Sequence, residues 1–185
     1  MRVSAALSLL GLALLLGCGT ARAGSDLLVG VHDDRIKWTE RPAPILGAMR
    51  ALGLGGMRVT LEWRRGKRHL TAPEHNALRR AVVAHRDGVR IVLGVYGPAA
   101  DAPDRPSARE DYCRFVRNVL LRYGEIRDVV IWNEANSDTF WRPRSGAAAG
   151  YAALLARCWD VLHSSVPSVN VLTTTAASHD PAAFI

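Results

Sequence analysis

The sequence has 185 residues, which is enough for one domain with its own hydrophobic core. Its formal net charge is +7, but the basic residues are mostly arginines scattered through helix-like segments. Residues 64–68 (Arg-Arg-Gly-Lys-Arg) form the one basic cluster, and no nucleic-acid-binding motif accompanies it. We therefore expect a solvated turn there and no nucleic-acid partner.

The first 23 residues have the pattern of a secretory signal peptide. Arg2 precedes an apolar run, and Ala-Arg-Ala at positions 21–23 offers a small-x-small cleavage site. The apolar run is shorter than the roughly 20 residues of a transmembrane helix. We expect a single domain over residues 24–185, without a transmembrane segment in the mature chain, secreted or held in the cell envelope. A second processing route is a lipid anchor at Cys18, because Leu-Leu-Gly-Cys resembles a bacterial lipobox.

Strands and helices alternate along the first half of the remaining chain. Residues 57–63 (MRVTLEW) alternate and are rich in β-branched side chains, as in a strand. Residues 71–88 open with Thr71, Pro73 and Glu74, which is the capping-box arrangement at the start of a helix. In chain order, this half predicts a strand over 26–34, a helix over 43–56, a strand over 57–63, a helix over 71–88 and a strand over 89–97.

The second half continues the alternation. It predicts a helix over 109–124, a strand over 129–135, a helix over 148–165 and a strand over 170–178. Cys113 and Cys158 lie inside the two helices of this half. Neighbouring helices pack about 8–10 Å apart, whereas a disulfide needs Cα atoms within about 7 Å. We therefore expect two small buried thiols rather than a bridge.

Strands that are apolar on both faces and separated by helices indicate βαβ units and a parallel sheet. An open doubly wound sheet and a (β/α)₈ barrel both fit this pattern. In either one, functional side chains gather at the carboxyl ends of the strands. The carboxyl ends of all five predicted strands carry polar or aromatic residues: His32, Asp33 and Asp34; Glu62 and Trp63; Tyr96; Trp132, Asn133 and Glu134; and Ser178, His179 and Asp180.

The segment VVIWNEANSDTFW, residues 129–141, carries the strongest chemical signal. A carboxylic acid held between aromatic side chains can donate a proton to a leaving oxygen and later take one from water. The indole rings of Trp132, Trp141 and Trp63 have flat apolar faces on which a sugar ring can stack. The amide of Asn133, next to Glu134, can bind a sugar hydroxyl with both a donor and an acceptor.

These residues also resemble a known family. V-I-W-N-E-A-N resembles the W-N-E-P-N segment at the end of the fourth barrel strand in clan A glycoside hydrolases, closest to bacterial members related to families 39 and 5. The resemblance implies that Glu134 is the general acid/base, that Asn133 binds a sugar hydroxyl and that Arg58, on the second strand, supports the site. It also implies a carbohydrate substrate hydrolysed with retention, and neither a metal nor an organic cofactor.

The further candidates for substrate contact are Trp63, Trp141 and His32, since each lies at or near a predicted strand end. The sequence departs from the family at Ala135, where proline is usual, and at Tyr96-Gly97, where many relatives have histidine. It also departs in length, because a barrel typically needs about 250 residues. We expect the amino-terminal five-eighths of a barrel, with the nucleophilic glutamate of strand seven absent.

Three readings of the function stay open at this point. The leading one is a truncated retaining glycoside hydrolase with Glu134 as acid/base. The alternative is a non-catalytic carbohydrate-binding protein derived from such a barrel. A small α/β protein with an accidental N-E match is the third. Glu62, Asp33 and Asp180 are carboxylates that could replace the nucleophile. We interpret them instead as solvated or hydrogen-bonding residues at the carboxyl-end rim of the sheet.

Overall fold

The computed structural model describes residues 27–174. Predictions for the signal peptide, for Cys18 and for Ser178, His179 and Asp180 lie outside this range. The elements in chain order are β1 (Gly30–His32), η1 (Asp34–Lys37), α1 (Ala43–Ala51), β2 (Gly56–Glu62), α2 (Ala72–Arg86), β3 (Arg90–Tyr96), η2 (Ala99–Asp101), α3 (Pro106–Arg122), β4 (Asp128–Ile131), α4 (Ala147–His163) and β5 (Asn170–Leu172).

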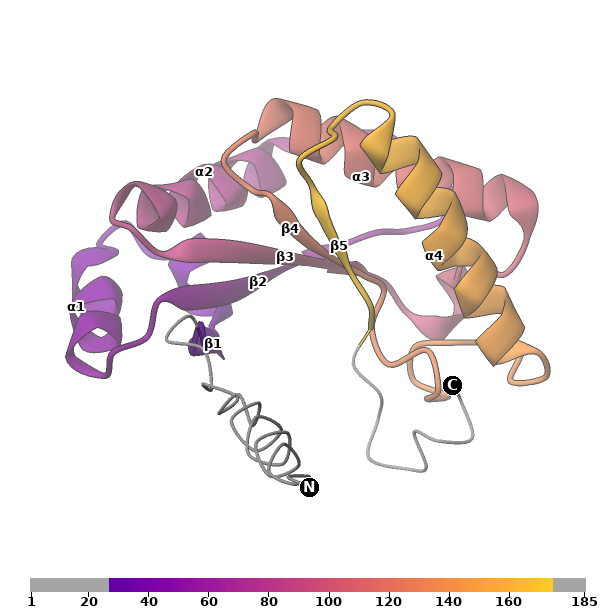
Figure 1. Ribbon diagram of the computed structural model, residues 1–185, viewed down its shortest axis with the longest axis horizontal. Coiled ribbons are helices and arrows are strands. Elements are labelled where there is room, and N and C mark those ends of the chain that lie inside the picture. Colours follow the sequence, from indigo (N-terminus) through magenta and orange to yellow (C-terminus); the bar gives the residue numbers. More distant parts are fainter. Residues whose placement is uncertain (1–26, 175–185) are drawn as a thin grey trace, which may run out of the picture.

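The five strands form one parallel sheet in the order β1-β2-β3-β4-β5 (Figure 1). A doubly wound sheet reverses its strand order at a switch point, and this sheet does not. The order therefore decides between the two architectures that the sequence left open. It is the order of consecutive βα units in a (β/α)₈ barrel, and the described sheet is curved but not closed, as expected of an incomplete barrel.

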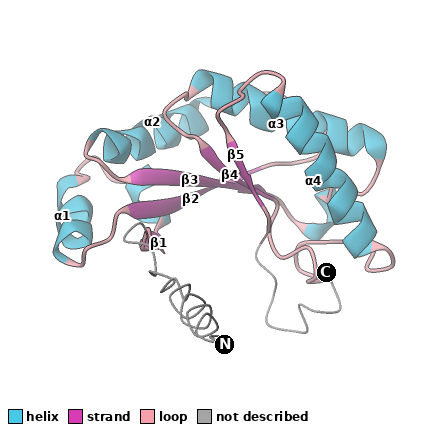
Figure 2. Ribbon diagram, in the orientation of Figure 1, coloured by secondary structure: helices cyan, strands magenta, loops and turns pink. Residues whose placement is uncertain are grey.

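The helices lie on one side of the curved sheet, with α2, α3 and α4 over its convex face (Figure 2). Along β2, Met57, Val59 and Leu61 are buried on one face. On the other face Arg58 is half-buried and Glu62 is exposed, while Thr60 between them is covered by Asp34 and Lys37. Alternation places successive side chains on opposite faces of a sheet. The face of Arg58 and Glu62 is thus the one turned away from the helices, which corresponds to the inside of a barrel.

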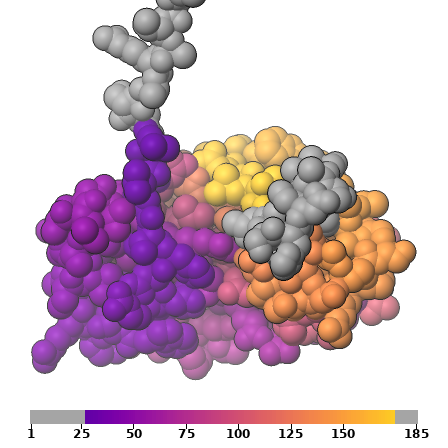
Figure 3. All heavy atoms as spheres, turned by 90° about the horizontal axis from the view of Figure 1, so that it is seen from below, coloured from indigo at the N-terminus to yellow at the C-terminus, as the bar shows by residue number. Residues whose placement is uncertain are grey.

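Figure 3 views the molecule from this uncovered side. The first described segments, in indigo and purple, lie on one side of the view. Helix α4 and the loop before it, in orange, lie on the other side. Among the described residues, no helix has the length and apolar character that a membrane crossing requires.

The predicted elements are confirmed, with shorter boundaries at the first, fourth and fifth strands. The capping box of α2 is present: Thr71 accepts a hydrogen bond from the backbone N–H of Glu74, and Glu74 accepts one from the backbone N–H of Thr71. The fourth strand ends at Ile131 rather than at Ala135, because Trp132 and Glu134 have positive φ angles of 65° and 35°. Such angles break the extended path of a strand.

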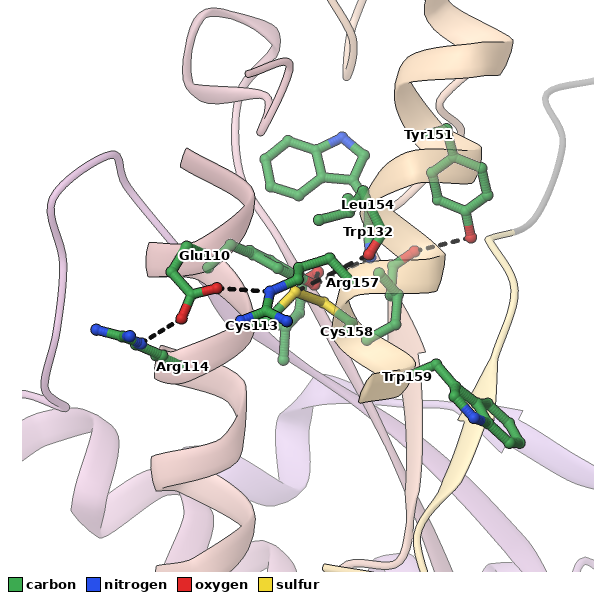
Figure 4. The surroundings of a disulfide bond; sticks show 12 residues. Glu110, Cys113, Arg114, Trp132, Tyr151, Leu154, Arg157, Cys158 and Trp159 are labelled. Carbon is green, nitrogen blue, oxygen red and sulfur yellow. Dashed lines mark hydrogen bonds and ion pairs between the residues drawn. A yellow bond between two sulfur atoms is a disulfide. The ribbon is translucent and has the colours of Figure 1, made fainter. Parts of the chain in front are cut away.

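The prediction for the two cysteines is wrong. Cys113 on α3 and Cys158 on α4 form a disulfide, with their Cα atoms 4.9 Å apart (Figure 4). The prediction compared the spacing of helix axes with the spacing of Cα atoms. Each Cα lies about 2.3 Å from its own axis, so residues that face each other across two packed helices have Cα atoms much closer than the axes are.

Candidate active site at the carboxyl ends of the strands

Glu134 lies half-buried just past the carboxyl end of β4, and the backbone around it is held from several sides. Both Trp132 and Glu134 have positive φ, which is uncommon for residues with side chains and concentrates at functional sites. The carbonyl of Glu134 accepts a hydrogen bond from the backbone N–H of Ser137 at 2.8 Å. The turn that follows β4 is therefore a specific conformation rather than a frayed strand end.

Tyr112 of α3 holds the start of this turn from the helical side of the sheet. Its fully buried hydroxyl donates to the carbonyl of Val95 on β3 at 2.6 Å and accepts from the backbone N–H of Trp132 at 3.1 Å. Burial raises the pKa of this phenol well above its usual value, so it stays neutral and keeps its proton for Val95. Tyr151 of α4 acts similarly one residue earlier, donating to the carbonyl of Ile131 at 3.1 Å.

The side chains of Arg58 on β2 and Asn133 after β4 meet across the sheet. A guanidinium N–H of Arg58 donates to the side-chain oxygen of Asn133 at 3.1 Å, which fixes the orientation of the amide next to Glu134. Arg58 reaches β4 by passing over Gly94 of β3: a Cβ atom at Gly94 would stand 3.0 Å from the guanidinium nitrogens. The Nε of Arg58 is buried and has no hydrogen-bond partner among the described residues.

Trp63 and Trp141 do not have the surroundings that sugar stacking requires. Their exposed fractions are 0% and 1%, and Trp132 is equally buried. The Trp132 ring makes edge-to-face contacts with Trp63, Trp141 and Tyr112, and Trp63 also meets Tyr112 edge to face. The structure thus places these indoles in the core, where they support the strand end, and neither Trp63 nor Trp141 has an exposed ring face for a sugar.

The first strand end carries a separate polar network. Asp34 accepts hydrogen bonds from the backbone N–H of Thr60, at 2.8 Å, and from its hydroxyl, and forms an ion pair with Lys37 at 3.1 Å. Burial alone would raise the pKa of Asp34, but these hydrogen bonds and the lysine outweigh it and hold the pKa below the usual value. His32 is exposed at the end of β1 and pairs in register with Arg58.

The other carboxylates considered as nucleophiles have partners of their own. Asp33 caps η1 and accepts several hydrogen bonds from Arg35, which hold its pKa below the usual value despite partial burial. Glu62 is exposed and pairs with Arg64 at 2.6 Å. Asp180 lies outside the described residues. Within residues 27–174 no group of three His, Cys, Asp or Glu residues is arranged to hold a metal ion.

Sequence reasoning missed Tyr112 and Gly94. It also missed the loop residues Trp38 and Phe140, which border a hollow beside the carboxyl ends of β2 and β3. Nothing in the local sequence distinguishes Tyr112 from any other core residue of α3, and Gly94 resembles an ordinary strand glycine. Trp38 had a usable signal: a tryptophan in a polar loop directly after a strand end.

Three solved structures are similar to the chain in fold. A family 39 glycoside hydrolase from the gut symbiont Bacteroides cellulosilyticus WH2 matches 85% of this chain and 34% of its own, with a TM-score of 0.61 and 15% identity. A broad-specificity GH5-4 endoglucanase from Clostridium longisporum matches 82% of this chain and 55% of its own, with a TM-score of 0.57 and 11% identity.

The third is an endocellulase from Pyrococcus horikoshii in a complex with cellotetraose. It matches 84% of this chain and 54% of its own, with a TM-score of 0.53 and 15% identity. No family model and no curated protein sequence matches the chain. The chain spans between about a third and just over half the length of these structures. It therefore has the fold of part of a clan A glycoside hydrolase barrel.

Proposed function

We propose that the chain carries the acid/base part of a retaining glycoside hydrolase site, with Glu134 as the general acid/base. The observation that carries the proposal is the hydrogen bond from Arg58 to Asn133, which brings the second strand to the residue next to Glu134. An acid/base carboxyl protonates the glycosidic oxygen as the bond breaks, and afterwards takes a proton from the attacking water. The positive-φ turn holds this carboxyl at the strand end.

Asn133 and Arg58 act on the substrate and on each other in this proposal. Asn133 donates to a sugar hydroxyl through its amide nitrogen, because its oxygen is held by Arg58. Arg58 positions that amide rather than reacting. Retention also requires a second carboxyl group about 5–5.5 Å from the first. We assign this nucleophile to a part of the site outside residues 27–174, because the strand-end carboxylates Asp33 and Glu62 are paired with Arg35 and Arg64.

Export through a signal peptide fits the same proposal. Structural disulfides persist in oxidising compartments such as the periplasm and the cell exterior. The Cys113–Cys158 bridge supports such a location for this domain, and a polymeric carbohydrate substrate is also met outside the cell.

Turnover of aryl β-glycosides and of plant polysaccharides, measured on the protein with the nucleophile-bearing part of the barrel present, tests the proposal, with Glu134→Gln as the decisive variant. Loss of a general acid lowers the rate by about 10²–10⁴-fold, and we expect a loss of that size. Glu125→Gln is the matched control, because Glu125 precedes β4 whereas Glu134 follows it. Equal turnover by the Glu134 variant and the wild type would remove Glu134 from the mechanism.

Carbohydrate binding without turnover, equal in the wild type and in Glu134→Gln, would favour the alternative function. The chain would then be a non-catalytic carbohydrate-binding protein that keeps the strand-end residues of the barrel.

A further inference from the structure

A groove lies between α2 and α3 on the helical side of the sheet. It consists of two adjoining hollows of about 630 and 200 Å³, which have His75 and Arg122 as common lining residues. The groove runs from the loop before α2 to the residues before β4, so it lies on the outside of the sheet. We name it the helix groove, and Glu134 is not among the residues that line it.

The arginines of the helix groove come from three separate segments. Arg79 and Arg86 are two turns apart on α2, so they lie on one face of the helix and about 10 Å apart along its axis. Arg122 ends α3, and Arg68 belongs to the loop before α2. Arginines that are scattered along the sequence are therefore gathered along one groove by the packing of two helices.

Carboxylates match few of these charges. Of the described residues that line the groove, Glu125 is the one acidic residue, and it pairs with Arg86 at 4.0 Å. Arg79 and Arg122 form no ion pair within residues 27–174, and Arg79 donates to the neutral side-chain amide of Asn76 instead. Both guanidinium groups can therefore accept an external anion without giving up an internal one.

The basic cluster at residues 64–68 divides in the same way. Three of its four basic residues have carboxylate partners in the fold: Arg64 with Glu62, Arg65 with Asp104 and Lys67 with Glu74. Arg68 has no such partner in the described part of the chain, and it lines the smaller hollow of the helix groove. The cluster thus contributes one unpaired cation to the groove.

Tyr123 shows that the two helices direct their arginines towards the same place. Val82 and Tyr123 are buried and form part of the inner wall of the groove. Burial raises the pKa of the Tyr123 hydroxyl, and the positive charges of Arg122 and Arg79 act in the opposite direction. Both guanidinium groups therefore lie near this hydroxyl, one from each helix, and a ligand that follows the groove meets both.

The ligand that suits such a groove is a linear chain of oxyanions. A planar guanidinium can donate two parallel hydrogen bonds to a carboxylate or to another oxyanion, and arginines spread along two helices suit repeated acidic groups better than one small anion. Single-stranded nucleic acid also stacks its bases on aromatic rings. Phe115 and Tyr123, the phenyl and phenol rings of the groove, are 1% and 6% exposed, so neither has a free face for a base.

We propose that the helix groove binds a linear acidic polysaccharide, with Arg79 and Arg122 holding its acidic groups from the two helices. The Cys113–Cys158 bridge supports a location outside the cytoplasm, where such polymers are met. This binding goes beyond the proposed function and does not depend on it. It attaches the domain to an acidic polymer and leaves the strand ends free.

Calorimetric titration of the full chain with polygalacturonate and with dextran sulfate tests the proposal, with dextran as the neutral probe. The first polymer carries carboxylates and the second carries sulfates, so the tighter binder identifies the acidic group. We expect the wild type to bind at least one of them, more weakly as salt is added, and not to bind dextran. We expect Arg79→Gln/Arg122→Gln to bind about tenfold more weakly, the size of two exposed ion pairs.

The matched control is Arg41→Gln/Arg105→Gln, which removes the same charge from two exposed arginines outside the groove. It should bind as the wild type does, and circular dichroism checks that both double variants fold. An equal loss of affinity in the two double variants would assign the binding to the overall charge and overturn the groove. A wild type that binds neither acidic polymer would also overturn it.

Glu125→Gln tests the groove by a gain of affinity, which a folding defect does not imitate. It removes the one carboxylate among the described lining residues and releases Arg86, so we expect the acidic polymers to bind about twofold to threefold more tightly. Weaker or unchanged binding by Glu125→Gln would contradict the proposal.

Oligothymidylate is the nucleic-acid probe. If it binds more tightly than both acidic polysaccharides and depends on Arg79 and Arg122, the groove is a nucleic-acid site and the proposal is overturned. Turnover of neutral aryl β-glycosides should be the same in Arg79→Gln/Arg122→Gln and in the wild type, so the groove and the proposed function fail separately.

Discussion

Residue by residue, the candidate site depends on side chains that hold the backbone as much as on those that face a ligand. Tyr112 is an example, since its hydroxyl joins β3 to the first residue of the positive-φ turn. The proposed acid/base follows two residues later. A small loss of order at Trp132 therefore displaces Glu134, and positioning errors of about 1 Å are costly in catalysis.

Tyr112→Phe removes this hydroxyl without changing the shape of the core. We expect the free energy of unfolding to fall by about 1–2 kcal/mol, the value of a buried hydrogen bond, and turnover to fall as well. Tyr123→Phe is the control, because the Tyr123 hydroxyl also bonds twice, to the His75 carbonyl at 3.1 Å and to the His75 ring at 2.8 Å, away from β4. Urea denaturation and kinetic assays measure both effects. Equal turnover by the two variants would assign Tyr112 a purely structural role.

At the scale of the elements, the two ends of the strands have different roles. The carboxyl ends carry the candidate site, whereas the amino ends of β3, β4 and β5 are joined by Asp128. This residue is 3% exposed, accepts two hydrogen bonds from Arg90 and accepts one from Asn170 at 2.8 Å. Burial opposes its ionisation, but the bonds from Arg90 and Asn170 outweigh burial and hold the pKa of Asp128 below its usual value.

This lowered pKa predicts a loss of stability in acid. Because the folded-state pKa lies below the unfolded value of about 3.9, the stabilisation is fully present above that pH and is lost as the pH falls through the folded-state pKa. Asp128→Asn lacks the titration, so we expect it to be less stable than the wild type by about 1–3 kcal/mol at pH 7 and the difference to shrink towards pH 3.

Denaturant unfolding at a series of pH values measures this difference. Asp87→Asn is the control, since Asp87 and its partner Arg50 are both well exposed. It should change stability by less than about 0.5 kcal/mol. A gap between Asp128→Asn and the wild type that stays constant from pH 7 to pH 3 would contradict the role of the Asp128 carboxylate.

At the scale of the whole molecule, the open sheet is held together on its helical side. The disulfide joins α3 to α4, the two helices that flank β4. Glu110 of α3 adds ion pairs to Arg114 at 2.5 Å and to Arg157 of α4 at 2.6 Å, on the outside of the same contact (Figure 4). The two helices whose tyrosines fix the end of β4 are thus covalently joined.

Removing the bridge should destabilise the domain without removing the fold of its first three strands. We expect the Cys113→Ala and Cys158→Ala double variant to lose about 2–4 kcal/mol of unfolding free energy. Thermal melts with and without reductant measure this: the wild type should lose a similar amount on reduction, and the double variant should be indifferent to reductant. A wild type whose melting temperature does not respond to full reduction would contradict a stabilising bridge.

The sequence by itself determined the alternation of strands and helices, the parallel sheet and the position of Glu134 at a strand end. These depend on local signals, namely apolar periodicity, the capping box at Thr71 and the glycines that follow helices. Only the tertiary structure decided which indoles are buried, that Arg58 reaches Asn133 over Gly94, and that Cys113 and Cys158 are bridged. Each of these depends on the direction of a side chain relative to a segment far away in the sequence, and local periodicity does not specify that direction.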